Sequence, residues 1–397
     1  NLILNDKKNY IRNILRISSI IIILFQLSCS QNKKRENIIV ASAGKIESLD
    51  PAQANTLRTL QILSALGDTL YKINKEGNLY PNLASGLPKS SRNRLIIDIP
   101  LKENISFHDG SVFNAAAMKF SLDRFMNIGT LNYLLKDKIE SIEVKDEFLL
   151  RIKLKKPSSS LKILLTSVNL TPVSPNSYSN YKDKFNNKNF IGTGPYLLES
   201  FSSNQQKIKP FKNYWGKKPL NNGIDFVNYS NSSTLFGAIK TREVDVLVSN
   251  SIDDLQRLTL NNMVKNKKIK SGEGPPIEIG YITFKSNNLP LENITIREAL
   301  SYTLDRELIS KQVSFGTRKP LRSLVPPQLH KNKFELWSKY KPNLARTLLK
   351  SEGYCEKNIL TIPLTFRSNI PADKLLALTW KELIKRDLSD CIEIKLN

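Results

Sequence analysis

The sequence predicts a mixed α/β protein of more than one domain. Its central stretch, residues 101–125, has the pattern of a strand end, a tight turn and a helix. Residues 360–396 have the pattern of a strand, a helix and a second strand. About 360 residues follow a leader-like segment, and this length is enough for two or more domains with a large core.

The chain begins with the pattern of a signal peptide. Four basic residues precede the apolar run 17–27, which is too short to span a bilayer. We expect residues 1–29 to be a signal peptide, Cys29 to be acylated as in a bacterial lipoprotein, and residues 30–36 to be a polar tether. Because Gln26 stands where a Leu is expected, a plain signal peptide with an incidental cysteine is the alternative.

The composition restricts the partners and cofactors. A net charge of +24 would fit a protein that binds nucleic acid or a membrane surface. Against this, the lysines are scattered along the sequence and the leader directs the chain out of the cytoplasm. We therefore expect a solvated basic surface and no nucleic acid. The two histidines, His108 and His330, have no second His or Cys at ligand spacing, so no metal site and no cofactor are predicted.

The central stretch combines turn and helix chemistry. Asp109-Gly110 predicts a tight turn, because Gly tolerates positive φ and Asp bonds to nearby backbone. Asn114 is placed as the N-cap of a helix whose apolar residues recur at helical spacing up to Phe125. By itself this is an ordinary strand–turn–helix without catalytic chemistry.

This stretch resembles the signature of the family 5 extracellular solute-binding proteins, which include the oligopeptide and dipeptide receptors of ABC importers. The family pattern is roughly Leu-x-x-Gly-x-x-Phe-x-Asp-Gly-x-x-(Phe/Leu)-Thr-Ala-x-Asp-Val. The chain departs from it at Asn104, Asn114 and Ala117. Asn is tolerated in a left-handed backbone and caps helices as well as Thr, so the first two departures are mild.

The elements before this stretch are expected as follows. Residues 37–43 form a buried strand, and Leu49-Asp50-Pro51 is similar to a family loop that borders the ligand cleft. Leucines recur on one helical face over 57–70. Residues 94–100 predict a further strand.

The elements after it include a hairpin and a second signature. The stretches 142–144 and 149–154 predict paired strands, and 168–174 predicts another. Residues 192–196, Gly-Thr-Gly-Pro-Tyr, resemble a family motif and predict a sharp bend into a strand. A phosphate loop is the alternative, but no helix start or Lys-Ser/Thr follows.

Further motifs appear in the family's order. They are the box Tyr214-Trp215-Gly216, the stretch 238–245, a strand at 246–248, a strand over 275–284 that carries Tyr281, and a helix at 296–306. Several motifs in one order are more specific than any one of them.

The last part predicts a βαβ unit from 360–366, 373–386 and 392–396, with a right-handed crossover. Cys355 and Cys391 each precede one of its strands. Because parallel neighbours start at the same sheet edge, we expect a disulfide between them, which an exported compartment permits. Two unpaired thiols are the alternative.

The resemblance implies the two-lobe fold of periplasmic binding proteins of type II (cluster C), α/β in class, with an extra α+β subdomain inserted in the first lobe. We expect a lobe I core from 37–56 and 191–274, the insertion over 57–190, and lobe II over 275–397. Lobe II is expected to be incomplete, because family members continue beyond this point and grip a peptide's amino end with an acidic residue there.

The resemblance also implies the function. We expect a monomeric receptor, tethered to a membrane in the periplasm or cell envelope, that binds short peptides between its lobes and delivers them to an ABC permease. Peptides bind such clefts as an added strand. By resemblance, the candidate ligand-binding residues are Ser48, Leu49, Asp50, Ser249, Asn250 and Tyr281.

Two alternatives stay open. Receptors of the same fold bind nickel, haem or sugars, although few His and Met residues argue against nickel. A secreted hydrolase would need a nucleophile with a positioned base. The sequence has no Gly-x-Ser-x-Gly, and His108 lies in a turn without an evident partner, so no catalytic residue is predicted.

Overall fold

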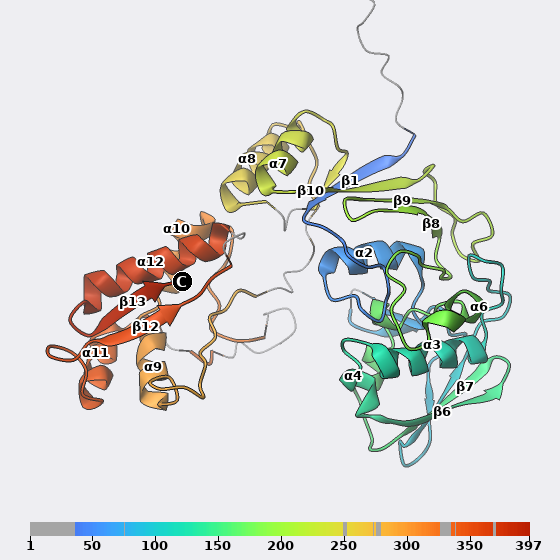
Figure 1. Ribbon diagram of the computed structural model, residues 1–397, viewed down its shortest axis with the longest axis horizontal. Coiled ribbons are helices and arrows are strands. Elements are labelled where there is room, and N and C mark those ends of the chain that lie inside the picture. The colour runs from blue at the N-terminus through green and yellow to red at the C-terminus, as the bar shows by residue number, and fades with distance from the viewer. Residues whose placement is uncertain are drawn as a thin grey trace, which may run out of the picture. The chain divides into compact units, whose positions relative to one another are not determined.

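The computed structural model describes residues 36–74, 76–248, 252–272, 274, 279–325, 335–337, 339–367 and 371–397. The described chain forms two compact units (Figure 1). Unit 1 holds the described residues up to Val40, then Lys45–Asn228 and Val244–Val246. Unit 2 holds Ala41–Gly44, Tyr229–Glu243 and the described residues from Leu247 on. The fold is mixed α/β, as the sequence predicts.

A five-stranded sheet has the order β11-β1-β10-β9-β8. Its strands are β1 (Ile38–Ala43), β8 (Tyr196–Phe201), β9 (Gln205–Pro210), β10 (Ile224–Tyr229) and β11 (Val246–Leu247). β9 pairs antiparallel with both β8 and β10. The predicted strands at 37–43 and 246–248 are therefore present, with β11 shorter than expected.

A four-stranded antiparallel sheet lies in unit 1 and has the order β4-β5-β7-β6. Its strands are β4 (Lys89–Ser90), β5 (Ile96–Pro100), β6 (Ile139–Asp146) and β7 (Leu149–Leu154). The helix α3 (Ala115–Ile128) packs on it, and together they bury an apolar cluster that includes Phe107, Phe113 and Met118 (Figure 1).

The predicted turn and cap chemistry is confirmed at the start of α3. Gly110 has φ +83° and Asn104 has φ +60°, so both occupy the left-handed region. The Asn114 side chain accepts a hydrogen bond from the Ala117 amide at 3.1 Å and caps the helix.

The remaining elements of unit 1 are short. A small hairpin pairs β2 (Tyr71–Ile73) with β3 (Leu79–Pro81). The helices are α2 (Leu57–Leu66), α4 (Tyr133–Lys136), α5 (Leu161–Leu164) and α6 (Pro175–Tyr178), with 3-10 turns η1 (Val168–Leu170) and η2 (Ser179–Tyr181). The predicted helix over 57–70 ends at Leu66, because Gly67 takes an extended backbone.

Two predicted strands are wrong. Residues 168–174 form η1 and the cap of α6, because Asn169 turns inward and donates from Nδ2 to the carbonyl oxygens of Pro51 and Ala54. Residues 279–284 form no strand with any described partner, and 275–278 lie outside the described residues.

α7 (Ser232–Lys240) and α8 (Asp254–Lys265) belong to unit 2, as do α9 (Ile294–Tyr302), α10 (Arg306–Ser314) and α11 (Pro342–Ser351). The predicted strand–helix–strand unit is confirmed as β12 (Leu360–Leu364), α12 (Pro371–Leu388) and β13 (Ile392–Leu396), with the strands paired in parallel. Trp380 of α12 is buried among residues of α9, α11 and both strands. Cys355 and Cys391 are joined by a disulfide at the start of the two strands.

Candidate functional site

The two strongest sequence signatures contact each other in unit 1. The backbone amide of His108 donates to the Gly192 carbonyl at 2.9 Å, and the Gly192 amide donates to His108 Nδ1 at 3.4 Å. His108 Nε2 therefore carries the proton and donates to the Gly194 carbonyl at 3.1 Å. Burial lowers the pKa of His108 to about 4, so the ring is neutral at pH 7. This histidine joins two segments and has no ring nitrogen left for a substrate or a metal.

The glycines of the second signature are required by close packing. A Cβ on Gly194 would lie 2.4 Å from the Leu66 carbonyl carbon and 2.5 Å from the Gly67 nitrogen. The Gly194 amide instead donates to the Leu66 carbonyl at 3.0 Å, at the end of α2. The motif therefore lets one backbone segment dock against the end of a helix.

The Asp109 carboxylate is held by serine hydroxyl groups, and no hydrogen bond joins it to a histidine in the described part of the chain. Its carboxylate accepts hydrogen bonds from Ser111, from Ser174 at 2.5 Å and from Ser177 at 2.7 Å. Burial alone would raise its pKa, but these bonds outweigh burial and hold the pKa below its usual value. The serines are tied to a carboxylate without an intervening imidazole, and this is not a nucleophile–base arrangement.

The Tyr-Trp-Gly box closes a second buried network. The Asp68 carboxylate accepts hydrogen bonds from Tyr214 Oη at 3.3 Å, Trp215 Nε1 at 3.1 Å and Asn82 Nδ2 at 3.3 Å. Lys72 Nζ lies 3.7 Å from it. Burial raises the pKa of Asp68. The hydrogen bonds to the carboxylate come from neutral donors and Lys72 is the nearby cation, and the network fixes the box against the end of α2.

The first group of predicted ligand residues lies inside unit 1. Leu49 and Asp50 have no exposed surface, and Ser48 is 7 % exposed. Ser48 Oγ donates to Asn187 Oδ1 at 3.1 Å. A solute would reach these side chains only if the loop rearranged, so their contact with a ligand stays a prediction.

The Asp50 carboxylate is fully engaged. Arg124 Nη1 and Nη2 contact its two oxygens at 2.9 and 2.5 Å. The backbone amides of Ala52 and Asn186 donate to it at 2.9 and 2.7 Å. Its position gives it a structural role, because it clamps α3 and the segment near Asn186 to the loop after β1.

The second group of predicted ligand residues is only partly described. Ser249 and Asn250 lie outside the described residues. Tyr281 lies in unit 2, and 69 % of its surface is exposed. The backbone at Tyr281 is irregular, where the sequence predicted a strand. The structure therefore does not bring the six candidates together as one described site.

Two polar groups that the sequence did not single out lie in the loop after Asp50 and in the first turn of α2. Gln53 Oε1 and Arg58 Nη1 are shielded from solvent and have no hydrogen-bond partner in the described part of the chain. No spacing or motif marks them, since a Gln and an Arg beside a helix start are commonplace. Only their burial reveals them.

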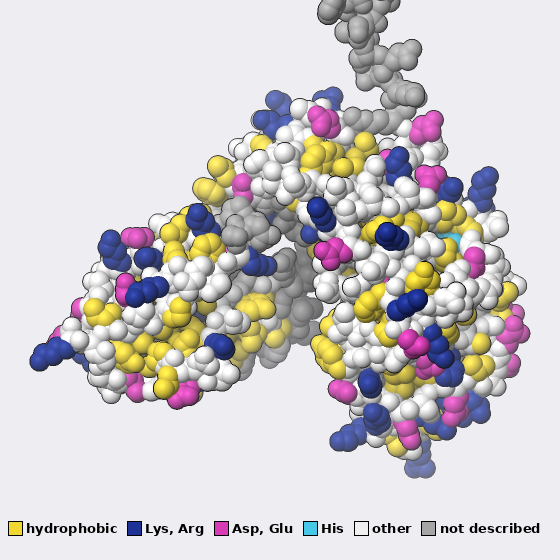
Figure 2. Space-filling view, in the orientation of Figure 1, with side chains coloured by type: hydrophobic (Ala, Val, Ile, Leu, Met, Phe, Trp, Pro, Cys, Tyr) yellow, Lys and Arg dark blue, Asp and Glu magenta, His cyan; other side chains and the backbone are white. Residues whose placement is uncertain are grey.

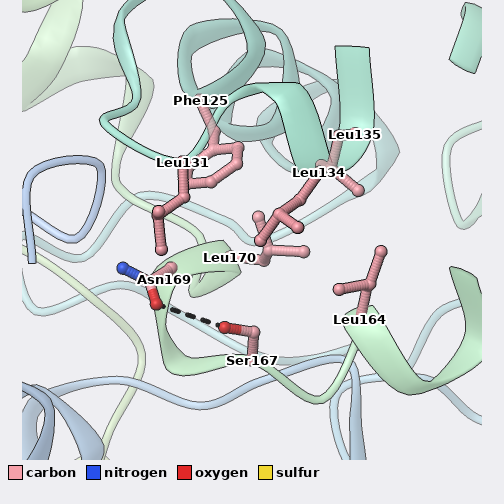
Figure 3. Close-up of a pocket in the computed structure, with 8 residues that line it drawn as sticks. All are labelled: Phe125, Leu131, Leu134, Leu135, Leu164, Ser167, Asn169 and Leu170. Carbon is pink, nitrogen blue, oxygen red and sulfur yellow. Dashed lines mark hydrogen bonds between the residues drawn. The ribbon is translucent and has the colours of Figure 1, made fainter. Parts of the chain in front are cut away.

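A small apolar pocket opens between α3, α4, α5 and η1 (Figure 3). Its cavity volume is about 60 Å³, and it is lined by Phe125, Leu131, Leu134, Leu135, Leu164, Ser167, Asn169 and Leu170. Its two polar side chains face each other, with Ser167 Oγ 3.3 Å from Asn169 Oδ1. The lining offers no charged group that would recognise a polar solute.

On the drawn face (Figure 2) and among the described residues, neither charge nor metal-ligand clusters indicate a further solute site. On the face drawn in Figure 2, Lys and Arg side chains are scattered and do not gather into one patch. Among the described residues, no three His, Cys, Asp or Glu side chains come together as metal ligands would. No helix in the described ranges is long and apolar enough to cross a membrane.

Comparisons with known proteins identify relatives over most of the chain. A model of the bacterial extracellular solute-binding proteins, family 5, matches residues 78–397. The glutathione-binding protein GsiB of Salmonella typhi is 28 % identical over 353 residues, which is 88 % of this chain and 67 % of that protein.

Solved structures share the fold at lower identity. A dipeptide-binding protein from a Pseudoalteromonas species, in complex with Met-Leu, is 21 % identical with a TM-score of 0.78 and covers 91 % of this chain and 75 % of its own. NikA from Staphylococcus aureus, in complex with Ni(L-His)2, is 22 % identical with a TM-score of 0.76. The match covers 91 % of this chain and 74 % of the NikA chain. At these identities the likeness concerns the fold alone, the mixed α/β two-lobe fold expected from the sequence.

Proposed function

Because this chain belongs to family 5 of the bacterial extracellular solute-binding proteins, we propose that the solute it binds for an ABC importer is a short peptide. Proteins of this family bind solutes outside the cytoplasm and are not enzymes. The peptide class is carried by one observation, the 28 % identity to a glutathione-binding protein over 88 % of the chain. Glutathione is itself a tripeptide.

The chemistry of peptide capture fits a binding protein without catalytic groups. An extended peptide offers main-chain donors and acceptors that give affinity for many sequences, while pockets give loose selectivity. The two side-chain arrangements that resemble catalytic sites, at His108 and at Asp109, are internal ties of unit 1. We propose Tyr281, with Ser249 and Asn250, as contacts to the peptide.

Nickel is the weaker alternative. Soft or imidazole ligands suit this metal, and both ring nitrogens of His108 are engaged by backbone groups. Haem or a sugar would also suit a receptor of this fold, and the test below includes all three.

We further propose that the exported protein is anchored through lipid on Cys29. A lipoprotein carries two or three acyl chains, enough for stable anchoring. Metabolic labelling with a palmitate analogue should tag the protein, and Cys29→Ala should abolish the tag. Absence of label on the wild type would contradict the anchor and leave the peptide proposal intact.

Calorimetry of the full-length protein tests the peptide proposal. A mixed library of short peptides should give saturable binding, whereas a nickel–histidine complex, haem and a sugar mixture should give none. Tyr281→Ala should weaken peptide binding about tenfold, because an exposed aromatic side chain supplies contact area. Tyr80→Ala, at another partly exposed tyrosine, serves as the control. Binding of nickel, haem or sugar without peptide would contradict the proposal.

A further inference from the structure

We propose that the exposed face of α8 and the lysines that follow it bind the surface of an anionic membrane. The helix is labelled in Figure 1. We define the α8 basic face by six residues of unit 2: Leu255, Leu258, Lys265, Lys267, Lys268 and Lys270. None of the signatures found in the sequence covers this stretch, and the proposal does not depend on which solute the protein binds.

The opposite side of α8 packs within unit 2. Leu260 is buried. The Asp254 carboxylate, in the first turn, is also buried and accepts a hydrogen bond from Thr317 at 3.4 Å. Because a helical turn holds about 3.6 residues, Leu255 and Leu258 lie on the other side of the helix from Leu260. This packing turns the α8 basic face outward.

The first observation is that leucines and a lysine share the outward side. Leu255 is 59 % exposed and Leu258 is 36 % exposed, one turn apart. Lys265 lies two turns beyond Leu258 on the same side and is exposed. A helix that presents leucines next to lysines suits the boundary between lipid headgroups and acyl chains.

The second observation is a run of positive charge. Lysines are scattered on the face drawn in Figure 2, but here four exposed lysines fall within the six residues Lys265–Lys270. The sequence from Leu255 to Gly272 contains no Asp or Glu. Asp254 stands at the other end of the helix, 3.7 Å from Arg257. An anionic surface would supply the counter-charge that this stretch lacks.

The third observation is the backbone at Lys267. Its φ is +57°, in the left-handed region where glycine is preferred at a helix end. The amides of Lys267 and Lys268 donate to the carbonyl oxygens of Val264 and Met263, both at 2.9 Å, and close the helix. The helix dipole accounts for a lysine in the last turn, but three of the four lysines follow the helix. Closing the helix does not require a lysine at position 267, whereas binding an anionic surface uses its charge.

The family fixes the compartment in which this face acts. The chain belongs to the extracellular solute-binding proteins, which leaves a membrane surface as the extended anion within reach of an importer's receptor. Anionic headgroups would pair with the lysines while the leucines enter the acyl boundary. An acidic protein surface is the other source of negative charge, and the test separates the two.

The test measures binding to lipid vesicles. Every protein is the full-length chain with Cys29→Ala, so that acylation contributes nothing. Vesicles of phosphatidylcholine alone are compared with mixed vesicles that also contain phosphatidylglycerol, over a range of salt concentrations. The variants are Leu255→Ala, the double change Lys267→Gln with Lys268→Gln, and the single change Lys267→Gly.

The matched control is the double change Lys155→Gln with Lys156→Gln. These two lysines are adjacent and exposed at the end of β7, in another basic stretch. Acids already pair there with Arg151 and Lys153. Circular dichroism checks that each variant is folded, which we expect because every changed side chain is exposed.

The expected result depends on charge. The parent and the control should bind the mixed vesicles at least about tenfold tighter than the neutral ones, and salt should weaken this preference. The change at Lys267 and Lys268 should weaken binding to mixed vesicles about 25-fold, at about fivefold for each lysine. Leu255→Ala should weaken it about threefold to fivefold. Any binding through the leader would be equal in all variants.

Lys267→Gly separates a binding role from a structural one. Glycine relieves the left-handed backbone, so thermal stability should rise while vesicle binding falls about fivefold. A merely structural lysine would change stability and leave binding unaltered.

A fluorescent label tests the contact itself. An environment-sensitive dye on Asn262→Cys, on the exposed side of α8, should report a less polar environment on mixed vesicles. The same dye on Asn93→Cys, exposed in unit 1, should not. The proposal is wrong if the parent shows no preference for anionic vesicles, if both double variants lose binding equally, or if the α8 label does not respond. Binding to the purified permease without binding to vesicles would assign the face to a protein partner and also overturn it. None of these results bears on the peptide proposal.

Discussion

Arg124 and Asp50, 74 residues apart in the chain, form a two-pronged ion pair with N–O distances of 2.9 and 2.5 Å. Both side chains are at least 98 % buried. The pair joins α3 to the loop that follows β1. Arg124 also donates to the carbonyl oxygens of Tyr181 and Lys184, so one guanidinium ties three segments together.

Removing this arginine should destabilise unit 1 strongly. Arg124→Gln leaves the Asp50 carboxylate buried without its cation, which should cost about 3 to 5 kcal/mol of unfolding free energy. Urea unfolding followed by circular dichroism measures it. The control is Arg151→Gln, which breaks the two-pronged but partly exposed pair with Asp98. An equal loss in both variants would contradict the structural role given to the buried pair.

The glycine at position 194 should resist substitution. Gly194→Ala places a methyl group against the backbone of Leu66 and Gly67, where no side chain can move aside. We expect a loss of about 3 kcal/mol or more. Gly237→Ala, inside α7 with open space around its Cβ, should raise stability by about 0.5 to 1 kcal/mol. Thermal unfolding compares the two, and a neutral Gly194→Ala would refute the docking of this motif.

His108 should make stability depend on pH. Its pKa is about 4 in the folded protein and about 6.5 in the unfolded chain, so the unfolded state binds the proton first as the pH falls. The contribution of His108 to the unfolding free energy is fully present above about pH 6.5 and is lost as the pH falls towards 4. The loss is about 2 kcal/mol when the partial exposure of the His108 side chain is allowed for. His108→Gln, which cannot titrate, should show a flatter profile between these values. The same slope in both proteins would assign the dependence to other groups.

The disulfide should be present in the exported protein. Titration of free thiols in the unfolded, unreduced Cys29→Ala variant should find none at Cys355 or Cys391. Since the bond closes a segment of 36 residues, its reduction should cost about 3 to 4 kcal/mol in the chain-entropy model. Two reactive thiols would contradict the pairing.

Local chemistry made much of the fold predictable. Asn104, Gly110 and Asn114 adopt the turn and cap conformations that their side chains favour, and the unit from β12 to β13 follows its apolar pattern. The elements that the sequence did not predict correctly depend on long-range contacts. The strand expected at 168–174 is lost because Asn169 bonds to Pro51 and Ala54, more than 100 residues away.

The candidate site was less predictable than the fold. The resemblance drew attention to Asp50, but its burial depends on Arg124, and nothing local to residues 48–50 reveals that partner. Arg58 carries no motif at all, and the shielding of its Nη1 atom is visible only in the structure.

The measurement that tests the central claim most directly is a mass spectrum of the solute that the full-length protein carries through native purification. The account predicts masses of short peptides, released on unfolding and replaced by added peptide. A nickel complex, a haem or a sugar as the only bound species would contradict the peptide account.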